Sequence, residues 1–431
     1  MKSFEQNTNL GGIFTRRLQV ADTLVNANAL FHGLKREPSF HKKITIAAGD
    51  VEDVMLRSAR KKLRDAIRAQ FARYSQVIKS ERVRQLLFEG RGHAFRDAMD
   101  KYPLTTVRFL TQGSFAYQLL VRPAKPEQEI DLDDGVYVPM PFVGGKPAVS
   151  SKGLFDLLET AIADVVASNG WKFERKDTCV RVLIGKGAHV DLPVYAVEAK
   201  EFERVRDLLD EQLDPQQEDW RGFDLVTASA LGRQIEAAKI LLAHREKDWE
   251  PSDPKQFSDW FVEQLDLYGP SLRRIIRYLK AWRDNSWVDG ELKSMALMIL
   301  CVSAFFDLEK RPSDDRDDLL VLEVARRLPQ MIRQGSIRWR DDKPCLDQNW
   351  SLEVRDEIAA KAEAFRHFVE SALVRNGVAE LTVKHLRSAF GDRFPDAPES
   401  VQIGVASRVA VLRDTKPVTV PQPNVGSSIS G

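Results

Sequence analysis

The sequence predicts an α+β fold, in which a catalytic core with a mixed sheet is joined to a helical lobe. Between about residues 104 and 197, short runs with strand-like alternation surround a single helical stretch, without regular strand-helix-strand repetition. After about residue 214 the apolar spacing is almost wholly helical. A chain of 431 residues also exceeds the roughly 250 to 300 residues that one core supports. We therefore expect two lobes.

The individual elements follow from local periodicity. Residues 50–74 form a long amphipathic pattern, and residues 152–170 form another that ends at a glycine. The expected strands are residues 105–114, 129–138, 178–185 and 188–197, and the expected helices of the second lobe include 271–284 and 351–373. The polar face of the first helix is an arginine-rich stripe, which we interpret either as a solvated surface or as a lip over a phosphate site; it consists of Arg57, Arg60, Lys61, Arg64 and Arg68.

Composition excludes several classes of protein. Lys and Arg total 64 against 63 Asp and Glu, so the net charge of +1 argues against a dedicated nucleic-acid binder. Three widely spaced cysteines argue against a zinc knuckle and a disulfide framework. The longest apolar run, residues 295–306, is shorter than the roughly 20 residues that span a bilayer. We expect a cytoplasmic protein without a membrane segment.

Three carboxylates indicate a metal site. Asp131 and Asp133 are two residues apart in a strand, so they project from the same face, and such a like-charged pair is tolerated when a cation lies between the carboxylates. Asp191 lies in the middle of another strand, with His189 on the same face. Oxygen ligands favour Mg²⁺, with Mn²⁺ as a substitute, and three acids can hold two ions. This set is typical of phosphoryl transfer.

A phosphate cradle is expected next to the carboxylates. If a helix begins after Gly113 and Ser114, its first N–H groups, the open glycine backbone and the serine hydroxyl can all approach a triphosphate. Arg181 lies on a strand near the acids and is either an ordinary strand-edge cation or a phosphate ligand. Gly-Ser and Asp-x-Asp are each common by chance, and their combination with Asp191 is what makes the pattern informative.

The motif block from residue 112 to 196 resembles the bacterial cGAS/DncV-like nucleotidyltransferases (CD-NTases), and within them the DncV-type cyclic GMP-AMP synthases. The resemblance rests on "TQGSFAYQLLVRP", "EIDLDDGVYVPMPF", "GWKFERKDTCVRVLIGKGAHVDLPVYA", "SDPKQFSDWF" and "RYLKAWRDNSW". It implies a DNA polymerase β-like core at 1–213 that includes N-terminal helices, a helical lobe at 214–395 that completes a nucleotide pocket in the central cleft, and a segment at 396–431 that ends in a flexible tail.

The resemblance also implies residue roles. Asp131, Asp133 and Asp191 would be the catalytic carboxylates that bind two Mg²⁺ ions. The nucleotide-binding set would comprise Gln112, Gly113 and Ser114 at a triphosphate, Tyr117 at a base, Arg181 at the acceptor nucleotide, Ser252 and Asp253 near a base, Lys280 and Ser294 at the donor triphosphate, and Asp341 (or its neighbour Asp342) at guanine.

The implied reaction joins ATP and GTP through two successive 3′-hydroxyl attacks on α-phosphates and yields 3′3′-cyclic GMP-AMP. The resemblance places such synthases in CBASS anti-phage defence, where an E1/E2-like protein conjugates the synthase through its C-terminal residue, here Gly431, and a protease reverses the conjugation. The cyclic dinucleotide would act on a downstream effector. No nucleic-acid polymer is expected as an activator.

Two alternatives remain at this point. Another cyclic or linear oligonucleotide synthase, or a different nucleotidyltransferase on the same core, would use the same site chemistry and differ only in its acceptor. A non-catalytic nucleotide-sensing scaffold would be expected to have damaged metal ligands, whereas Asp131, Asp133 and Asp191 are all present.

Overall fold

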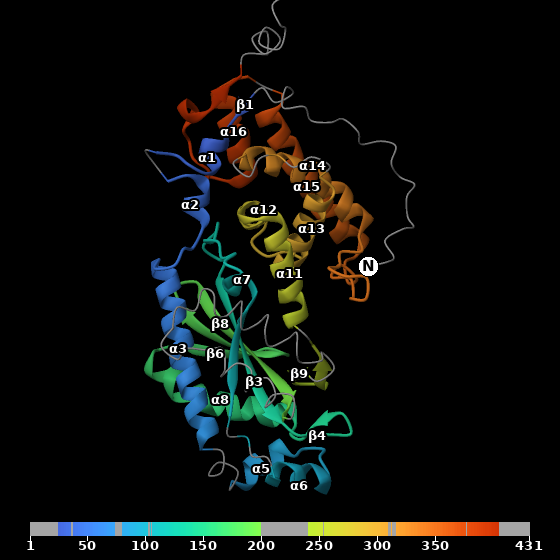
Figure 1. Cartoon of the computed structure of the whole chain (residues 1–431). Helices are drawn as coiled ribbons and strands as arrows, with labels where there is room; N and C mark the ends of the chain where they lie inside the picture. Colours follow the sequence, from blue (N-terminus) through green and yellow to red (C-terminus); the bar gives the residue numbers. More distant parts are fainter. Residues whose placement is uncertain are drawn as a thin grey trace, which may run out of the picture.

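The computed structural model of the chain describes residues 25–35, 38–73, 80–101, 104, 106–199, 240–252, 254–308, 312, 316–375 and 377–404. These residues form two lobes, one built on a mixed sheet and one helical, with the short helix α7 (Gly113–Ala116) at the junction between them (Figure 1). The predicted α+β class and bilobed arrangement are confirmed.

The sheet of the first lobe places the predicted strands side by side. Its strands are β2 (Arg108–Gln112), β3 (Ile130–Met140), β6 (Lys172–Arg175), β7 (Cys179–Gly185), β8 (Ala188–Glu198), β9 (Ile240–His244) and β10 (Asp248–Pro251). β3 and β8 are parallel, β2 is antiparallel to β3, and both β7 and β9 pair antiparallel with β8. The sheet is therefore mixed, and its two longest strands lie next to each other at its centre.

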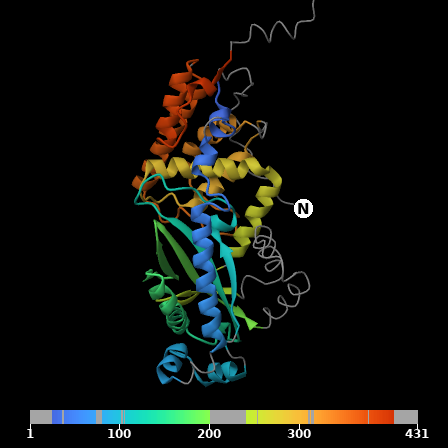
Figure 2. The same cartoon turned by 90° about the vertical axis from the view of Figure 1, so that its left-hand side faces the viewer.

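One face of this sheet is covered by helices. α3 (Val51–Ala72) and α8 (Ser151–Ser168) pack together on that face, and Figure 2 shows α3 running along the sheet. The side chain of Leu63 from α3 and that of Leu154 from α8 belong to the same buried apolar cluster as Leu132 of β3. Because strand side chains alternate between faces, Asp131 and Asp133 project from the opposite face, toward the junction between the lobes.

The second lobe is a bundle of helices with its own buried core. Its helices are α11 (Pro254–Tyr268), α12 (Pro270–Ser286), α13 (Ser294–Phe306), α14 (Asp317–Gln334), α15 (Leu352–Leu373) and α16 (Ala379–Phe390). α12 is amphipathic, with Leu272, Ile275 and Leu279 buried. The apolar run expected at 295–306 is α13, a buried helix, and no helix among the described residues is long and apolar enough to cross a membrane.

Two groups of segments depart from their order in the sequence. The short helices α1 (Asn28–Phe31) and α2 (Phe40–Ile44) pack in the core of the helical lobe, where Phe31 and Phe40 contact Tyr278 of α12. β9 and β10, after residue 214, extend the sheet, so residues 240–251 depart from the almost wholly helical pattern that was predicted there. The domain limits themselves stay predictions.

The remaining elements are short and peripheral. They are β1 (Val25–Asn26) paired with β11 (Gln402–Ile403), α5 (Glu81–Leu87), α6 (His93–Lys101), β4 (Phe142–Val143) paired with β5 (Lys146–Pro147), and the 3-10 turn η3 (Pro398–Ser400).

The arginine-rich stripe of α3 faces the sheet at two points. Arg64 forms a two-pronged ion pair with Asp134, 2.5 and 2.7 Å from its carboxylate oxygens, and Arg60 donates to the Thr111 hydroxyl at 2.7 Å. Asp134 is fully buried on the face of β3 opposite to Asp131 and Asp133. Arg64 therefore joins α3 to the sheet and does not form a lip over the carboxylates.

Candidate active site

The three predicted carboxylates lie on adjacent central strands. Asp133 of β3 is the register partner of Asp191 on β8, and Asp131 is the partner of His189. Parallel pairing of β3 with β8 thus brings together acids that are about sixty residues apart in the sequence. A prediction based on strand alternation alone is confirmed in its essential part: the three side chains share one face of the sheet.

Gly113 is required beside these acids. Its φ of +64° is a left-handed conformation, and an added Cβ would lie 2.2 Å from Oδ2 of Asp133. Glycine therefore lets the chain turn directly from β2 into α7 without backbone strain and without displacing the Asp133 carboxylate. Ser114 follows within α7 and is buried, so the predicted Gly-Ser cradle adjoins the carboxylates.

The carboxylates form a negative cluster that nearby cations compensate only in part. Burial, and then the charges of Asp131 and Asp191, raise the pKa of Asp133 to about 8. Arg181 and Lys280 act in the opposite direction without cancelling this effect. Oxygen ligands whose mutual repulsion is relieved by a cation fit a divalent metal ion. In the described ranges, no three Asp, Glu, His or Cys side chains are placed so that they could together hold a metal ion without moving.

Asp191 is held by Arg181. The guanidinium of Arg181 donates from Nε and Nη2 to the two carboxylate oxygens of Asp191, each at 2.8 Å, from the neighbouring strand β7. Nδ1 of His189 lies 2.8 Å from Oε2 of Glu129, and the imidazole is buried. Asp191 is therefore oriented by two hydrogen bonds from the Arg181 guanidinium, and His189 is a packed residue beside the site.

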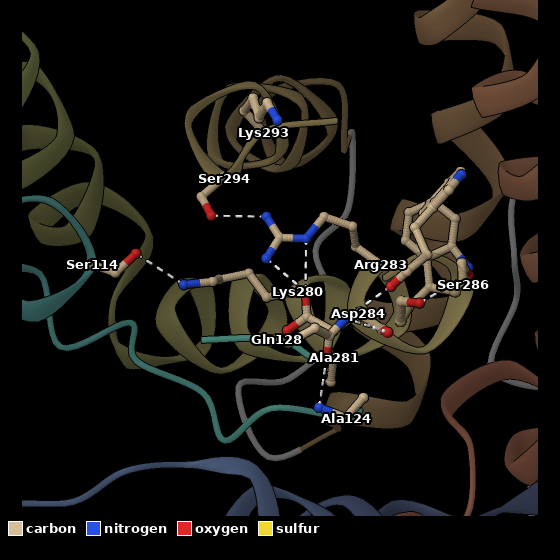
Figure 3. Close-up of polar contacts among 12 residues, drawn as sticks. Ser114, Ala124, Gln128, Lys280, Ala281, Arg283, Asp284, Ser286, Lys293 and Ser294 are labelled. Carbon is tan, nitrogen blue, oxygen red and sulfur yellow. Dashed lines mark hydrogen bonds and ion pairs between the residues drawn. The ribbon is translucent and has the colours of Figure 1, made fainter. Parts of the chain in front are cut away.

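Lys280 approaches the cradle from the helical lobe. Its ammonium is buried and donates to Oγ of Ser114 at 2.9 Å, as Figure 3 shows. It also donates to the carbonyl oxygen of Leu119 at 2.9 Å. Burial, followed by the charge of Arg283, lowers the pKa of Lys280 to about 8. Ser114 and Lys280, which the resemblance assigns separately to triphosphate binding, are thus in direct contact, and their roles stay predictions.

Ser294 extends this row of polar groups. It is the first residue of α13, and its hydroxyl accepts a hydrogen bond from Nη1 of Arg283 at 2.8 Å. Figure 3 shows Ser114 with Lys280 and Ser294 with Arg283 as neighbouring pairs on α7, α12 and α13. Sequence reasoning missed Arg283. The available signal was its position one helical turn after Lys280 in "RYLKAWRD".

The side chain of Gln112 has protein partners. Its amide nitrogen donates to the Tyr137 hydroxyl at 2.7 Å, and its amide oxygen accepts from the Tyr195 hydroxyl at 3.2 Å. The two tyrosine rings are stacked, with centroids 4.6 Å apart. The Gln112 side chain thus braces the sheet face beside the carboxylates, and its contact with a triphosphate stays a prediction.

Tyr117 is packed against the helical lobe. The residue is 4% exposed, and its ring makes edge contacts with Phe257 and Phe261 of α11. Burial raises the pKa of its hydroxyl to about 12, and Ser258 forms a hydrogen bond with it. Contact between Tyr117 and a nucleotide base stays a prediction.

The other predicted base contacts surround α11. Ser252 is half-buried between β10 and α11, and Asp341 is exposed in the turn after α14. The loop of Asp341 packs onto α11, because Lys343 donates to Gln256 and its neighbour Trp339 contacts Phe257. The structure thus brings this loop toward Tyr117, and the roles of Ser252 and Asp341 stay predictions. Asp253 and Gly431 lie outside the described residues.

Comparison with known proteins agrees with this geometry. The profile of the nucleotidyltransferase domain "Cyclic GMP-AMP synthase DncV-like" matches residues 107–195, and the profile of the "Cyclic GMP-AMP synthase, C-terminal domain" matches residues 269–402. The cyclic GMP-AMP synthase of Vibrio cholerae is 33% identical over 319 residues, which are 70% of this chain and 71% of the relative. A synthase from Escherichia coli is 32% identical, with 73% of each chain covered.

Solved structures show the same relationship. A variant of the Vibrio cholerae di-nucleotide cyclase DncV matches with a TM-score of 0.74 and 26% identity, covering 88% of this chain and all of that one. DncV in complex with the linear intermediate 5′ pppA(3′,5′)pG matches with a TM-score of 0.71 and 27% identity, covering 89% of this chain and 99% of that one. The chain therefore belongs to the DncV-like nucleotidyltransferases, the enzyme family of the bacterial cyclic GMP-AMP synthases.

Proposed function

We propose that this enzyme joins ATP and GTP into a cyclic dinucleotide, 3′3′-cyclic GMP-AMP. The observation that carries the proposal is the placement of Asp133 beside Asp191, with Gly113 directly against Asp133 and Ser114 bonded to Lys280. Negative oxygen ligands for a cation thus adjoin a glycine-serine turn and a buried cation suited to a triphosphate. Complexes of related DncV proteins contain ATP, GTP and a linear intermediate.

Each half-reaction has the same balance of bonds. A 3′-hydroxyl oxygen bonds to the α-phosphorus of a nucleoside triphosphate, the bond from that phosphorus to the bridging oxygen breaks, and pyrophosphate leaves. Ser114 and Lys280 would hold the leaving phosphates, whose negative charge increases as that bond breaks. Asp191, oriented by Arg181, would lie on the side of the attacking hydroxyl and accept the proton that this hydroxyl loses.

Asp131, Asp133 and Asp191 are the residues that would hold two Mg²⁺ ions, or Mn²⁺ as a substitute. When bound, the ions would supply Lewis-acid stabilisation of the attacking and leaving oxygens. The raised pKa of Asp133 supports this assignment, since a cation would relieve the repulsion among the three carboxylates.

We further propose a cytoplasmic role in CBASS anti-phage defence. The cyclic dinucleotide would be read by an effector. An E1/E2-like protein would conjugate the chain at Gly431, and a protease would remove the conjugate. These partners rest on the family resemblance alone.

The test combines product identity with a matched inactive variant. Purified full-length protein is incubated with MgCl₂ and all four nucleoside triphosphates, each α-labelled in turn, and the products are treated with phosphatase and separated. A resistant product that requires both ATP and GTP supports the proposal, because a ring has no terminal phosphate. The variant D131A/D133A should fold, as judged by circular dichroism, and give no product.

Other outcomes are equally informative. A phosphatase-sensitive ladder would favour a linear polymerase, and a resistant product from ATP alone would correct the base choice. Product formation by D131A/D133A would overturn the assignment of the carboxylates. If the isolated chain makes nothing, the assay is repeated with the conjugating partner, and continued absence of product would contradict the proposed synthesis.

A further inference from the structure

We propose that Arg283 is a second cationic ligand of the donor triphosphate and that it presents Ser294 to the same phosphates. This inference rests on the proposed function and deepens it, because it adds a residue to the binding of the substrate. Its basis is the geometry at the C-terminal end of α12, where Arg283 and Lys280 are one helical turn apart, bonded to Ser294 and Ser114 respectively.

The guanidinium of Arg283 is fixed in place before any ligand binds. Its Nε and Nη2 donate to Oδ1 of Asp284 at 2.8 and 2.6 Å, and its Nη1 donates to Ser294. A guanidinium has five N–H groups. The described residues accept from three of them, which leaves two N–H groups available to an anion on a side chain that is 21% exposed.

The helix end that carries Arg283 is attached to the sheet lobe. The side-chain nitrogen of Gln128 donates to the carbonyl oxygens of Asp284 and Trp287, each at 2.8 Å. The amide oxygen of the same side chain accepts from the backbone of Ala124 at 2.8 Å, as Figure 3 shows. Arg283 therefore stands on a helix end held at a fixed position relative to the segment that follows α7, which is the kind of preorganisation that a binding site requires.

The charges of this region are arranged for a polyanion. Lys280 and Arg283 are like charges side by side, one of them buried, and the charge of Arg283 lowers the pKa of Lys280 further than burial alone. The Asp284 carboxylate offsets part of the charge of Arg283, and a phosphate group between the two cations would relieve the repulsion that remains. Arginine binds phosphate through two parallel N–H groups, whereas lysine acts as a point charge.

The position of Ser294 strengthens the assignment to a triphosphate. The resemblance to the synthases assigns Lys280 and Ser294 to the donor phosphates, and Arg283 is hydrogen-bonded to Ser294 and lies within electrostatic reach of Lys280. A triphosphate that spans Ser114, Lys280 and Ser294 must therefore pass the guanidinium.

The experiment measures binding separately from turnover. The wild-type chain and the variants R283M and R283K are titrated by calorimetry with an ATP analogue whose α,β-bridging oxygen is replaced by a methylene group, and with AMP. The control is K293M, which removes the same charge at the residue before Ser294, where the side chain is 66% exposed and points to solvent. Circular dichroism and thermal unfolding check that each variant folds.

We expect R283M to weaken binding of the analogue about 10- to 100-fold, as the loss of charged hydrogen bonds predicts, and to leave AMP binding unchanged. R283K should bind the analogue with intermediate affinity, because lysine retains the charge but lacks the paired N–H donors of the guanidinium. K293M should match wild type. In turnover assays of R283M, the KM for the donor nucleotide should rise more than kcat falls.

Equal affinity of R283M and wild type for the analogue would overturn the inference. An equal loss in K293M would also overturn it, since the effect would then reflect only net charge. A wild-type chain that binds the analogue but makes no cyclic product, even with the conjugating partner, would refute the proposed product and leave the role of Arg283 standing. A wild-type chain that does not bind the analogue would refute both.

Discussion

The ammonium of Lys280 lies 2.9 Å from the hydroxyl oxygen of Ser114, and this contact joins the helical lobe to the glycine-serine turn beside the carboxylates. The same ammonium donates to the Leu119 carbonyl, so it also fixes the segment that leaves α7. A cation buried at the junction of two lobes is costly without an anion. The triphosphate that we propose to bind there would supply such an anion.

The burial of Lys280 predicts a specific dependence of stability on pH. Its pKa falls from the ordinary 10.5 to about 8 in the folded chain. Below pH 8 the Lys280 side chain is protonated in both the folded and the unfolded chain. Burial of its charge then lowers the free energy of unfolding by about 3 kcal/mol. Between pH 8 and 10.5 the unfolded chain binds more protons, so the free energy of unfolding rises with pH. Relative to K280M, wild type should gain about 2 kcal/mol between pH 7 and pH 9.5.

Guanidinium unfolding of wild type and K280M at both pH values measures how the stability difference between the two proteins changes with pH. The titrations of all other groups cancel in this comparison. A relative stability of wild type and K280M that does not change across the window would show that the ammonium is not desolvated in solution. Saturation with a triphosphate should reduce the gain, because a bound anion raises the pKa of Lys280 again.

Substitution of Gly113 by alanine should remove activity, because the added Cβ would clash with a site carboxylate. The new Cβ would lie 2.2 Å from Oδ2 of Asp133 and force that carboxylate or the turn to move. We expect at least a 100-fold fall in kcat/KM with the fold retained. Gly170→Ala is the matched control, because Gly170 has a nearly identical φ of +66° and open space around it. Both variants carry a similar backbone cost, about 1 kcal/mol.

If G113A and G170A lose activity to the same extent in steady-state assays, general backbone strain would account for the effect, and the close approach of Gly113 to Asp133 would have no special role.

Local periodicity was sufficient to predict the strands and helices that carry the main site residues. Strand alternation places Asp131 and Asp133 on one face, and helical spacing identifies α12 with Lys280. The pairing of β3 with β8, by contrast, depends on contacts between segments about sixty residues apart, and no single stretch of sequence records its register. The strand pattern suggested Asp191 as the third carboxylate, and the family resemblance implied the same residue, but neither records the register.

The departures from prediction also arise from contacts between segments that are far apart in the sequence. The amide of Gln112 meets Tyr137 and Tyr195 only because three strands come together, so its partners could not be read from its neighbours in sequence. β9 and β10 join the sheet after a long intervening segment. Arg64 lies on the helical face toward Asp134, seventy residues away, and a charged helix position is ordinarily solvated.

The pair formed by Arg64 and Asp134 predicts a large effect on stability. The side chain of Arg64 is 15% exposed and that of Asp134 is fully buried, so the change R64M would leave an unpaired buried carboxylate. We expect a loss of about 3 to 5 kcal/mol in the free energy of unfolding. On the same helix, K61M removes an equal charge from an exposed ion pair and should cost at most about 0.5 kcal/mol. Urea unfolding of both variants compares them, and equal losses would contradict a structural role for Arg64.

Arg181 allows two roles to be separated experimentally. It grips both carboxylate oxygens of Asp191, and the family resemblance places it at the acceptor nucleotide. If it orients a metal ligand, R181M should raise the Mg²⁺ concentration needed for half-maximal activity about 10- to 100-fold, the effect typical of residues that position metal ligands.

If Arg181 instead binds the acceptor, R181M should raise the KM of that nucleotide at saturating Mg²⁺ and leave the Mg²⁺ dependence unchanged. The fork of two 2.8 Å hydrogen bonds favours the first role, because a guanidinium committed to Asp191 has fewer N–H groups left for a phosphate. We therefore expect R181M to shift the Mg²⁺ dependence of activity. R181K keeps the charge but loses the paired N–H donors of the guanidinium, so it should not return the Mg²⁺ dependence to that of wild type. Restoration by R181K would show that charge alone matters at this position.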